Sequence, residues 1–404
     1  MIRILAASNA FWCASGYGVQ GRSLLPRLAE LPEIGGREAI AQFAWYGLHG
    51  GLHSIDGFKI YPAGNDPYGN DIIGSHAKHH RANVVIMLID AWVLKDTAKA
   101  VAPAVWLPWL PIDMEPVPQR ILDALGGAYL PMTYARWGHD TLRAAGIDNL
   151  YMPLGLEPDT YRILPDDAVR RFRAEVLNDP RHLTVMVAAN KGYPDRKGFQ
   201  FQLRAWADFA KDKPGARLYI HTEPTTVYQG IDFAALIANL GIADRVTFPD
   251  RYQNFLGYSP EYMSLIYNAA DVFLGAAMSE GFGIPLIEAQ ACGAPVITTD
   301  ATSMPELLRW GIAVAPADRW WSPLGAWQYI PHTAGITKAL NQLYAEWHDN
   351  GDKWDIAPRE GASRMIHEEY GWDVIMRDHW APLIERLADM LEPAQIAELV
   401  EVAT

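Results

Sequence analysis

The stretch Ser279-Glu-Gly-Phe-Gly-Ile-Pro-Leu-Ile-Glu288, continued by Ala-Gln-Ala-Cys-Gly-Ala-Pro-Val-Ile-Thr298, carries the strongest structural signal in this chain. It follows a predicted buried strand, and a helix is expected to begin at Pro285. Gly281 and Gly283 allow a tight loop whose backbone amides can approach an anion. The helix start adds free amides and the positive end of a dipole. This order predicts a parallel α/β domain with a diphosphate-binding loop.

Two glutamates lie at the ends of this stretch. Glu280 stands at the loop entrance, where a sugar joined to the diphosphate would lie. Glu288 comes about one turn into the helix and is placed to accept hydrogen bonds from ribose hydroxyls. The alternative is an ordinary strand–loop–helix junction with solvated glutamates. Two glycines alone would favour that alternative, but the full string and its continuation favour a binding site.

Outward from this stretch, short apolar runs alternate with amphipathic segments in both halves of the chain. This alternation predicts two mostly parallel sheets with helices on both faces. The Pro- and Gly-containing stretch Leu154–Asp159 is a candidate linker. We therefore expect an α/β protein with two Rossmann-like domains facing a cleft, residues 1–155 and 156–370, and a helical segment 371–404. The predicted strands are 2–7, 84–89, one within 101–109, 183–189, 217–221, 246–248, 272–275 and 295–298. The predicted helices are 19–31, 119–125, 135–145, 199–211, 233–240, 262–270, 285–291, 336–347 and 373–391, while 320–332 is expected to be irregular.

Composition excludes several function classes. The 404 residues carry a formal charge of −13, so the sequence gives no strong nucleic-acid signal, because phosphate neutralisation requires positive charge. No apolar stretch approaches the roughly 20 residues of a membrane helix. The two cysteines, Cys13 and Cys292, lie far apart, which favours a reducing cytosol. The cluster His76, His79 and His80 lacks matching ligand spacing and is expected to lie on a solvated face, so no metal site is predicted.

The Ser279–Glu288 string and its Cys-Gly-Ala-Pro-Val continuation resemble the signature of the family-4 (group 1) retaining glycosyltransferases, which have the two-domain GT-B fold. The resemblance implies that Glu280 contacts hydroxyls of the transferred sugar and Glu288 the ribose. It also implies that the loop from Gly281 through Phe282 and Gly283 to Ile284 holds the donor. The terminal helix would pack back on the N-terminal domain, as in relatives. Neither a cofactor nor a metal is implied, and a nucleoside diphosphate sugar serves as co-substrate.

A second segment, Asn190-Lys-Gly-Tyr-Pro-Asp-Arg-Lys-Gly198, resembles the family's Gly-Arg…Lys-Gly segment, whose two cations neutralise the diphosphate. Lys197 matches the family lysine. Lys191 stands where the arginine is expected, with Asn190 in place of a glycine, and Arg196 is a candidate to compensate. Lysine is a point charge and lacks the bidentate fork of arginine. The alternative is a solvated basic turn.

Two weaker signals lie in the first half. Ser15-Gly-Tyr-Gly18 resembles the family's glycine loop, in which Gly16 and Gly18 would let the backbone approach the donor or acceptor; a plain strand–helix turn is the alternative. Asp113, within Pro108–Pro118, stands near where family members often carry a histidine. It is a catalytic candidate that would orient the acceptor hydroxyl, or else an aspartate that caps a local turn.

These observations predict a hexosyl-type retaining glycosyltransferase that is metal-independent and cytoplasmic. Glu280, Asp113 and Lys197 are its catalytic candidates. The alternatives are a GT-B-fold nucleotide-sugar epimerase or phosphorylase and a catalytically silent nucleotide-sugar-binding protein. The sequence leaves open the acceptor, which is a glycan, small molecule, protein or hydroxylated nucleobase, as well as the donor base and sugar and the oligomeric state. Trp106 and Trp109 either stack on an acceptor or pack in the core.

Overall fold

The computed structural model describes residues 1–45, 49–177, 180–190, 195–225 and 230–402, and side chains up to residue 391. It divides into two compact units. The first comprises Met1–Ile112, Pro116–Gly155 and Trp372–Thr404, and the second comprises Asp113–Glu115 and Leu156–Gly371. The sequence analysis placed residues 113–115 in the first domain. They group with the second because the Trp327 amide donates to the Glu115 carbonyl at 2.8 Å in an isolated antiparallel bridge.

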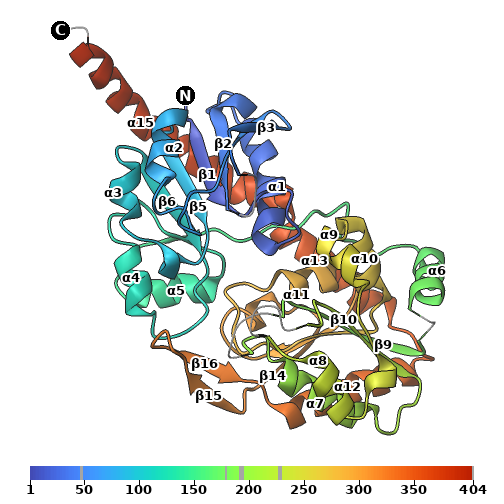
Figure 1. Ribbon diagram of the computed structural model, residues 1–404. Coiled ribbons are helices and arrows are strands. Elements are labelled where there is room, and N and C mark those ends of the chain that lie inside the picture. The colour runs from blue at the N-terminus through green and yellow to red at the C-terminus, as the bar shows by residue number, and fades with distance from the viewer. Residues whose placement is uncertain (46–48, 178–179, 191–194, 226–229, 403–404) are drawn as a thin grey trace. The chain divides into compact units, whose positions relative to one another are not determined.

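The first unit is built on a sheet whose described strands run in the order β3-β4-β2-β1-β5-β6-β7-β8. All neighbouring strands are parallel except the pair β3 and β4. The strands are β1 (Ile4–Ser8), β2 (Ile40–Ala44), β3 (His53–Ile55), β4 (Phe58–Tyr61), β5 (Val84–Leu88), β6 (Val105–Leu110), β7 (Met132–Thr133) and β8 (Leu150–Tyr151). The helices of this unit are α1 (Gly16–Ala29), α2 (Ile73–His80), α3 (Thr97–Val101), α4 (Gln119–Ala124), α5 (Arg136–Ala144), α14 (Trp372–Ile375) and α15 (Ala381–Val402) (Figure 1).

The central strands β1, β2 and β5 are buried along their whole length, as expected for parallel strands covered on both faces. The C-terminal helical segment belongs to this unit, as predicted. A π-helical turn, Met376–Trp380, joins α14 to α15, and Trp380 packs edge-on against Trp109 with ring centroids 5.0 Å apart. Both rings are fully buried, and Trp106 is buried as well, so Trp106 and Trp109 are core residues.

The second unit contains a parallel sheet whose described strands run in the order β11-β10-β9-β12-β13-β14. Its strands are β9 (His182–Val187), β10 (Ala216–His221), β11 (Val246–Thr247), β12 (Val272–Gly275), β13 (Val296–Thr299) and β14 (Gly311–Val314). Numbered from β9, this is the 3-2-1-4-5-6 order of a Rossmann fold. The helices are α6 (Asp166–Val176), α7 (Phe199–Ala210), α8 (Phe233–Asn239), α9 (Arg251–Leu256), α10 (Pro260–Ala269), α11 (Ile284–Ala291), α12 (Thr333–Asp349) and α13 (Ile356–Tyr370).

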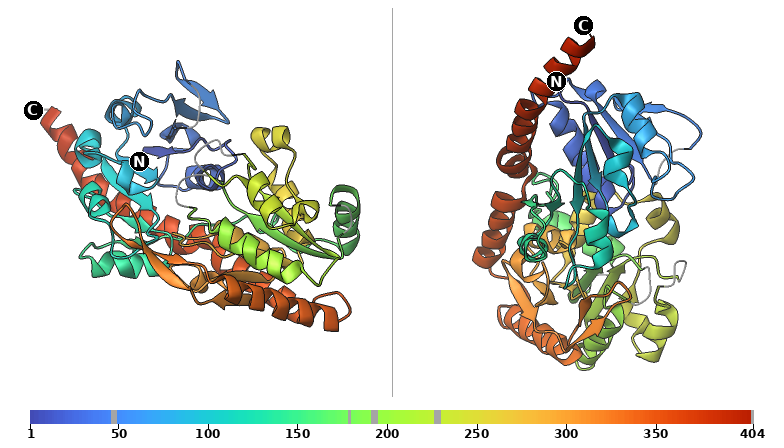
Figure 2. Two further views of the ribbon diagram at one scale, coloured as in Figure 1. Left: turned by 60° about the horizontal axis from the view of Figure 1, so that its bottom comes forward. Right: turned by 90° about the vertical axis from the view of Figure 1, so that its left-hand side faces the viewer.

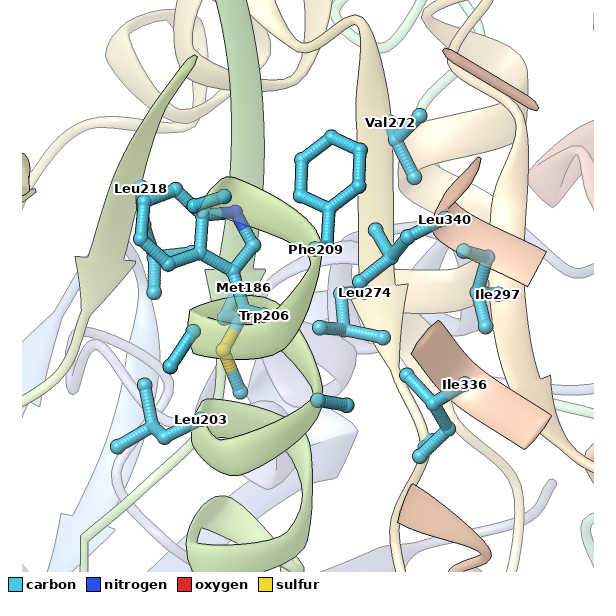
Figure 3. Close-up of a cluster of buried hydrophobic side chains, with 14 of the residues drawn as sticks. Met186, Leu203, Trp206, Phe209, Leu218, Val272, Leu274, Ile297, Ile336 and Leu340 are labelled. Atoms are coloured by element: carbon cyan, nitrogen blue, oxygen red, sulfur yellow. The ribbon is translucent and has the colours of Figure 1, made fainter. Parts of the chain in front are cut away.

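The core of the second unit lies between this sheet and the helices α7 and α12, which run side by side (Figures 1 and 2). Figure 3 shows Trp206 and Phe209 from α7 among side chains of the strands, with Ile336 and Leu340 from α12 beside them. Trp206 is fully buried and its indole N–H donates to Thr184 on β9 at 3.0 Å. This packing confirms the predicted helices at 199–211 and 336–347.

Two expectations about local structure are wrong. Residues 320–332 were expected to be irregular, but they contribute to an antiparallel hairpin, β15 (Asp318–Trp321) and β16 (Trp327–Ile330). Its turn closes because Gly325 adopts φ 78° and the Ser322 amide donates to the Ala326 carbonyl at 2.8 Å. His76 and His80 were expected to be solvated. They lie on the buried face of α2, where the Nε2 atoms of His76 and His80 contact the carbonyls of Pro62 and Ala39.

None of the helices in the described segments combines the length and the apolar character needed to cross a membrane.

Candidate functional site

The candidate site forms at the point in the second sheet where the strand order reverses. Strands β9 and β12 are hydrogen-bonded neighbours, but their connections run to opposite sides of the sheet. Ligands of doubly wound sheets bind in the crevice that this reversal opens at the carboxyl ends of the strands. The segment after β9 carries Arg196 and Lys197, and the segment after β12 carries Glu280. Topology therefore brings together two motifs that are far apart in sequence.

Backbone and side-chain hydrogen bonds fix the segment after β9 against the segment after β12. The Met278 amide donates to the Arg196 carbonyl at 2.9 Å. The buried carboxamide of Gln202, on α7, accepts from the Ala276 amide at 2.9 Å and donates to the Lys197 carbonyl at 2.7 Å. Gly198 adopts φ 68° at the start of α7, and a Cβ there would come within 2.8 Å of the Ala276 carbonyl oxygen. The Lys-Gly pair is therefore fixed directly beside the end of β12.

Four charged side chains meet at this place. Lys197 Nζ lies 2.6 Å from Glu280 Oε1. Arg196 Nη1 lies 3.6 Å from Glu280 Oε2 and 3.4 Å from Asp113 Oδ2, and it donates to the Ser279 carbonyl at 2.8 Å. The structure thus brings together all three residues predicted to be catalytic, Glu280, Asp113 and Lys197, within the second unit. It also places Arg196 at their centre.

Burial and neighbouring charges shift the pKa values of these groups in opposite directions. Burial by itself would raise the pKa of Glu280, but Lys197 and Arg196 outweigh it and hold that pKa below its ordinary value. Burial lowers the pKa of Lys197, and the adjacent Glu280 carboxylate opposes this shift. The carboxylate of Glu280 is therefore ionised at neutral pH. The site offers cations for a phosphate and carboxylates that can accept hydrogen bonds from sugar hydroxyls.

The loop from Ser279 to Gly283 is anchored by residues that follow β13. The Thr302 hydroxyl accepts from the Glu280 amide at 3.1 Å, and the Ser303 hydroxyl donates to the carbonyls of Glu280 and Phe282 at 2.8 and 2.7 Å. The sequence analysis missed Thr302 and Ser303. Their position just after a predicted strand, at the same edge of the sheet, was the available signal.

The predicted donor loop makes a sharp turn into α11. Gly283 adopts φ 119° at the start of α11, and a Cβ there would come within 2.9 Å of Leu286 Cδ1, so glycine is required. Ile284 is the first residue of that helix, and the Phe282 ring is buried edge-on against Tyr370. Among the hydrogen bonds between described residues, none has the amides of Gly281, Phe282 or Gly283 as donor.

Glu288 lies one turn into α11 and is buried. The Tyr267 hydroxyl donates to its Oε2 at 2.7 Å, and Tyr161 also hydrogen-bonds to the carboxylate. Burial raises the pKa of Glu288 to about 7, although both tyrosines act to lower it. The predicted ribose-binding carboxylate is thus a buried, tyrosine-supported group that titrates near neutrality. Sequence reasoning missed Tyr161 and Tyr267.

Lys191 and Asn190 were both singled out in the predicted basic segment. Lys191 lies outside the described residues. Asn190, which stands where the resembled family has glycine, has a structural task. Its side-chain amide donates to the carbonyls of Glu223 and Ile231 at 3.0 and 2.9 Å, and its oxygen accepts from the Ile231 amide at 2.7 Å. The Asn190 side chain therefore connects the segment after β9 to the segment that follows β10.

The glycine loop predicted in the first unit lies at the start of α1. Ser15 caps this helix, since its hydroxyl accepts from the Gly18 amide at 3.1 Å. Gly16 is the first residue of the helix, and a Cβ on Gly18 would come within 2.4 Å of the Cys13 carbonyl oxygen. The close approach of the backbone explains Gly18 without a ligand. Gly16 and Gly18 remain donor-binding candidates only as predictions.

Among the described residues, no cluster of three or more histidine, cysteine, aspartate or glutamate side chains suited to a metal ion occurs.

Two Rossmann-like units, one of them with cations and carboxylates gathered at its strand-order reversal, define the GT-B class of proteins. Solved structures confirm this fold. Sucrose-phosphate synthase from Thermosynechococcus elongatus superposes with a TM-score of 0.72 at 17% identity, covering 98% of this chain and all of that one. HepE from Anabaena, in complex with UDP-glucose, superposes with a TM-score of 0.69 at 14% identity, covering 97% of this chain and all of that one.

The sequence of the second unit resembles a known family. Residues 182–320 match the family model described as glycosyl transferases group 1. A D-inositol 3-phosphate glycosyltransferase from Segniliparus rotundus is 30% identical over 172 residues, which are 42% of this chain and 35% of the relative. The match thus spans about a third of that relative's length. The recognised segment contains Lys197, Glu280 and Glu288, and the resemblance drawn from the sequence is confirmed.

Proposed function

We propose that this protein is a retaining glycosyltransferase that moves a sugar from a nucleoside diphosphate sugar to an acceptor hydroxyl, without a metal ion. The observation that carries the proposal is the cluster of Lys197, Arg196 and Glu280 at the strand-order reversal of a group 1 glycosyltransferase domain. A nucleoside diphosphate sugar combines two phosphates with a neutral ring of hydroxyls. The cluster offers cations and carboxylates side by side, which suits such a molecule.

The donor fits the site in one direction. The diphosphate would lie against the amides of Gly281 to Gly283 and beside Lys197, where the start of α11 also favours negative charge. The ribose would then reach Glu288, and the sugar would lie at Glu280. Donor binding would draw Lys197 from Glu280 toward phosphate oxygen. The freed carboxylate oxygens of Glu280 would then accept hydrogen bonds from the sugar hydroxyls.

In the transfer step, the bond between the anomeric carbon and the diphosphate oxygen breaks, and its electron pair leaves with the diphosphate. Lys197, Arg196 and the loop amides stabilise the negative charge that develops there. The acceptor oxygen forms the new bond on the same face of the sugar, and its proton passes to the departing phosphate oxygen. This route requires no protein nucleophile. Asp113, held 3.4 Å from Arg196, would orient the acceptor hydroxyl.

The proposal includes the cellular setting and the donor. Cys13 and Cys292 are not joined by a disulfide, and we include a reducing, cytoplasmic location in the proposal. The UDP-glucose complex of HepE, a structural neighbour, makes UDP-glucose the first donor to test. A panel of UDP-, GDP-, ADP- and dTDP-sugars, screened by thermal shift, extends this test, because a ligand that binds the native state raises the unfolding temperature.

The decisive experiment measures the release of nucleoside diphosphate from the best donor, with water as acceptor. Proton NMR of the first sugar released reports retention as the same anomer that the donor carries. Lys197→Ala is expected to lower the release rate about 100-fold or more. Lys211→Ala is the matched control, because Lys211 lies in an exposed pair with Asp208. The proposal fails if no donor in the panel binds, if the inverted anomer appears first, or if the two lysine variants release the diphosphate equally fast.

A further inference from the structure

The hairpin β15–β16 (Figure 1) carries aromatic side chains that lie outside the proposed donor site. Antiparallel pairing sets Trp321 opposite Trp327 and Arg319 opposite Tyr329, so these four side chains share one face. Trp321 is 50% exposed, and its ring meets that of Trp327 at a centroid distance of 4.9 Å. The Arg319 guanidinium lies over the Trp327 ring at 5.3 Å. We call Arg319, Trp321, Trp327 and Tyr329 the Trp321 platform.

Strand β16 is fastened to the segment that leads into the donor loop. The side chain of Gln328, on the other face of the hairpin, is buried and donates to the Ser279 hydroxyl at 3.1 Å. The Tyr329 amide donates to the Met278 carbonyl at 3.0 Å. Ser279 directly precedes Glu280. The platform is therefore held in a fixed position next to the place proposed for the transferred sugar.

A second set of contacts joins the platform to Asp113. The Tyr329 hydroxyl donates to Glu115 Oε1 at 2.6 Å, and the Trp327 amide donates to the Glu115 carbonyl at 2.8 Å. Glu115 lies two residues after Asp113, which pairs with Arg196 beside Glu280. Contacts thus connect the Trp321 platform to Glu115, and the chain leads from Glu115 through Met114 to Asp113.

We infer that the Trp321 platform binds the acceptor, and that the acceptor is a neutral oligosaccharide whose reacting hydroxyl lies at Asp113 and whose following sugar stacks on Trp321. This inference rests on the proposed transferase function. A large, rigid aromatic ring offers apolar area at little cost in conformational entropy, and the C–H faces of a pyranose match it. The ring hydroxyls find charged partners at the rim, where Arg319 and Glu115 lie.

Charge narrows the class of acceptor. The inference requires an acceptor of two or more sugars, because it places the reacting hydroxyl at Asp113 and a following sugar on Trp321. The carboxylates of Asp113, Glu115 and Glu280, in a chain of net charge −13, disfavour a polyanion such as nucleic acid.

The test uses the full-length protein on an array of immobilised neutral oligosaccharides, with single- and double-stranded DNA and RNA spots on the same surface. Wild type is compared with Trp321→Ala and with Phe255→Ala. Phe255 is a matched control because its ring is 84% exposed on α9, away from the hairpin. The affinity of each protein for UDP-glucose, or for the best donor found in the thermal-shift panel, is measured separately by calorimetry.

We expect wild type and Phe255→Ala to retain at least one oligosaccharide of two or more sugars, and Trp321→Ala to bind it about tenfold more weakly, the loss typical of removing one aromatic contact. Retention of nucleic acid alone, of no oligosaccharide, or equal binding by both variants overturns the inference. A parallel loss of donor affinity in Trp321→Ala also contradicts it, because the ring would then merely support the donor loop. If wild type binds a glycan but no donor, the proposed transferase function fails and the glycan site remains.

Discussion

Lys197 Nζ lies 2.6 Å from Glu280 Oε1 although 83 residues separate the two in sequence. The contact exists because β9 and β12 are neighbours at the strand-order reversal of the second sheet. The two side chains are mostly buried, with 22% and 17% of their surfaces exposed. A mostly buried contact between opposite charges affects both the stability of the fold and the binding of ligand. Mutations can separate these two effects.

The first prediction concerns this pair. Lys197→Met and Glu280→Gln are each expected to lower the free energy of unfolding by about 1–3 kcal/mol, because each leaves a partly buried charge without its closest partner. The double variant should lose less than the sum of the single losses. Guanidinium unfolding measures these values. All three variants should have lost donor turnover, so stability recovers in the double variant while activity does not. Additive losses of stability would show that the two side chains do not interact.

The second prediction concerns the buried carboxyl of Glu288. Its pKa of about 7 in the folded protein lies above that of an unfolded glutamate, so the folded state binds more protons between about pH 4.5 and 7. This group therefore stabilises the fold less as pH rises through that window. Glu288→Gln does not titrate. The free energy of unfolding of Glu288→Gln minus that of wild type should therefore increase by about 2–3 kcal/mol from pH 5 to pH 8.

Denaturant unfolding at the two pH values tests this expectation. Glu385→Gln on α15, which replaces an exposed glutamate, is the matched control and should show no such shift. A difference between Glu288→Gln and wild type that stays constant with pH would mean that Glu288 is ionised throughout, as an exposed carboxylate would be.

The third prediction concerns the backbone of the donor loop. Gly283→Ala should lower the free energy of unfolding by about 1–2 kcal/mol, because φ is 119° at this position and the new Cβ would meet Leu286 Cδ1 at 2.9 Å. It should also weaken donor binding, since the neighbouring amides would shift. Gly361→Ala is the control within α13, where nothing lies within 4 Å of the added Cβ. That change should stabilise the protein by up to about 1 kcal/mol. Equal effects of the two substitutions on thermal unfolding would exclude a special conformation at Gly283.

The fourth prediction concerns Gln202, which positions Lys197 without touching the proposed ligand. Gln202→Leu removes the partners of the Ala276 amide and the Lys197 carbonyl and should lower the free energy of unfolding by about 1–3 kcal/mol. Because Lys197 would lose its fixed position, the turnover rate should fall more than the donor affinity. Gln200→Leu, an exposed neighbour on α7, should change neither. A variant at Gln202 that is less stable but turns over donor at the wild-type rate would assign this side chain a purely structural role.

Some features of the site were predictable from local sequence and others were not. The loop from Gly281 to Gly283 was predictable, because positive φ at a strand–helix junction requires glycine and because that requirement is local. The hairpin of residues 318–330 was not. Its alternation of Trp, Arg, Gln and Tyr lacks a clean apolar face, since one face carries the exposed Trp321 and the other carries the buried Gln328 bonded to Ser279. A polar residue that is buried because it bonds to a residue far away in the sequence interrupts the apolar–polar alternation. Periodicity therefore does not predict the strand.

The histidines of α2 show the same limit. His76 and His80 look solvated as residue types, but the Nε2 atom of each ring contacts a backbone carbonyl outside α2. A polar group is buried without a large energetic cost only where it has a hydrogen-bond partner. That partner is supplied by the fold, and the pattern of neighbouring residues does not reveal it.

By itself, the order of apolar runs and amphipathic segments determined that this protein has two parallel α/β units and that a glycine loop opens the helix before Glu288. Both follow from interactions between residues close together in the chain. Only the tertiary structure decided that Lys197 meets Glu280, that Asp113 groups with the second unit beside Arg196, and that Tyr161 and Tyr267 surround Glu288. These contacts join segments that only the strand order of a sheet brings together, and strand order is set by the packing of the whole unit.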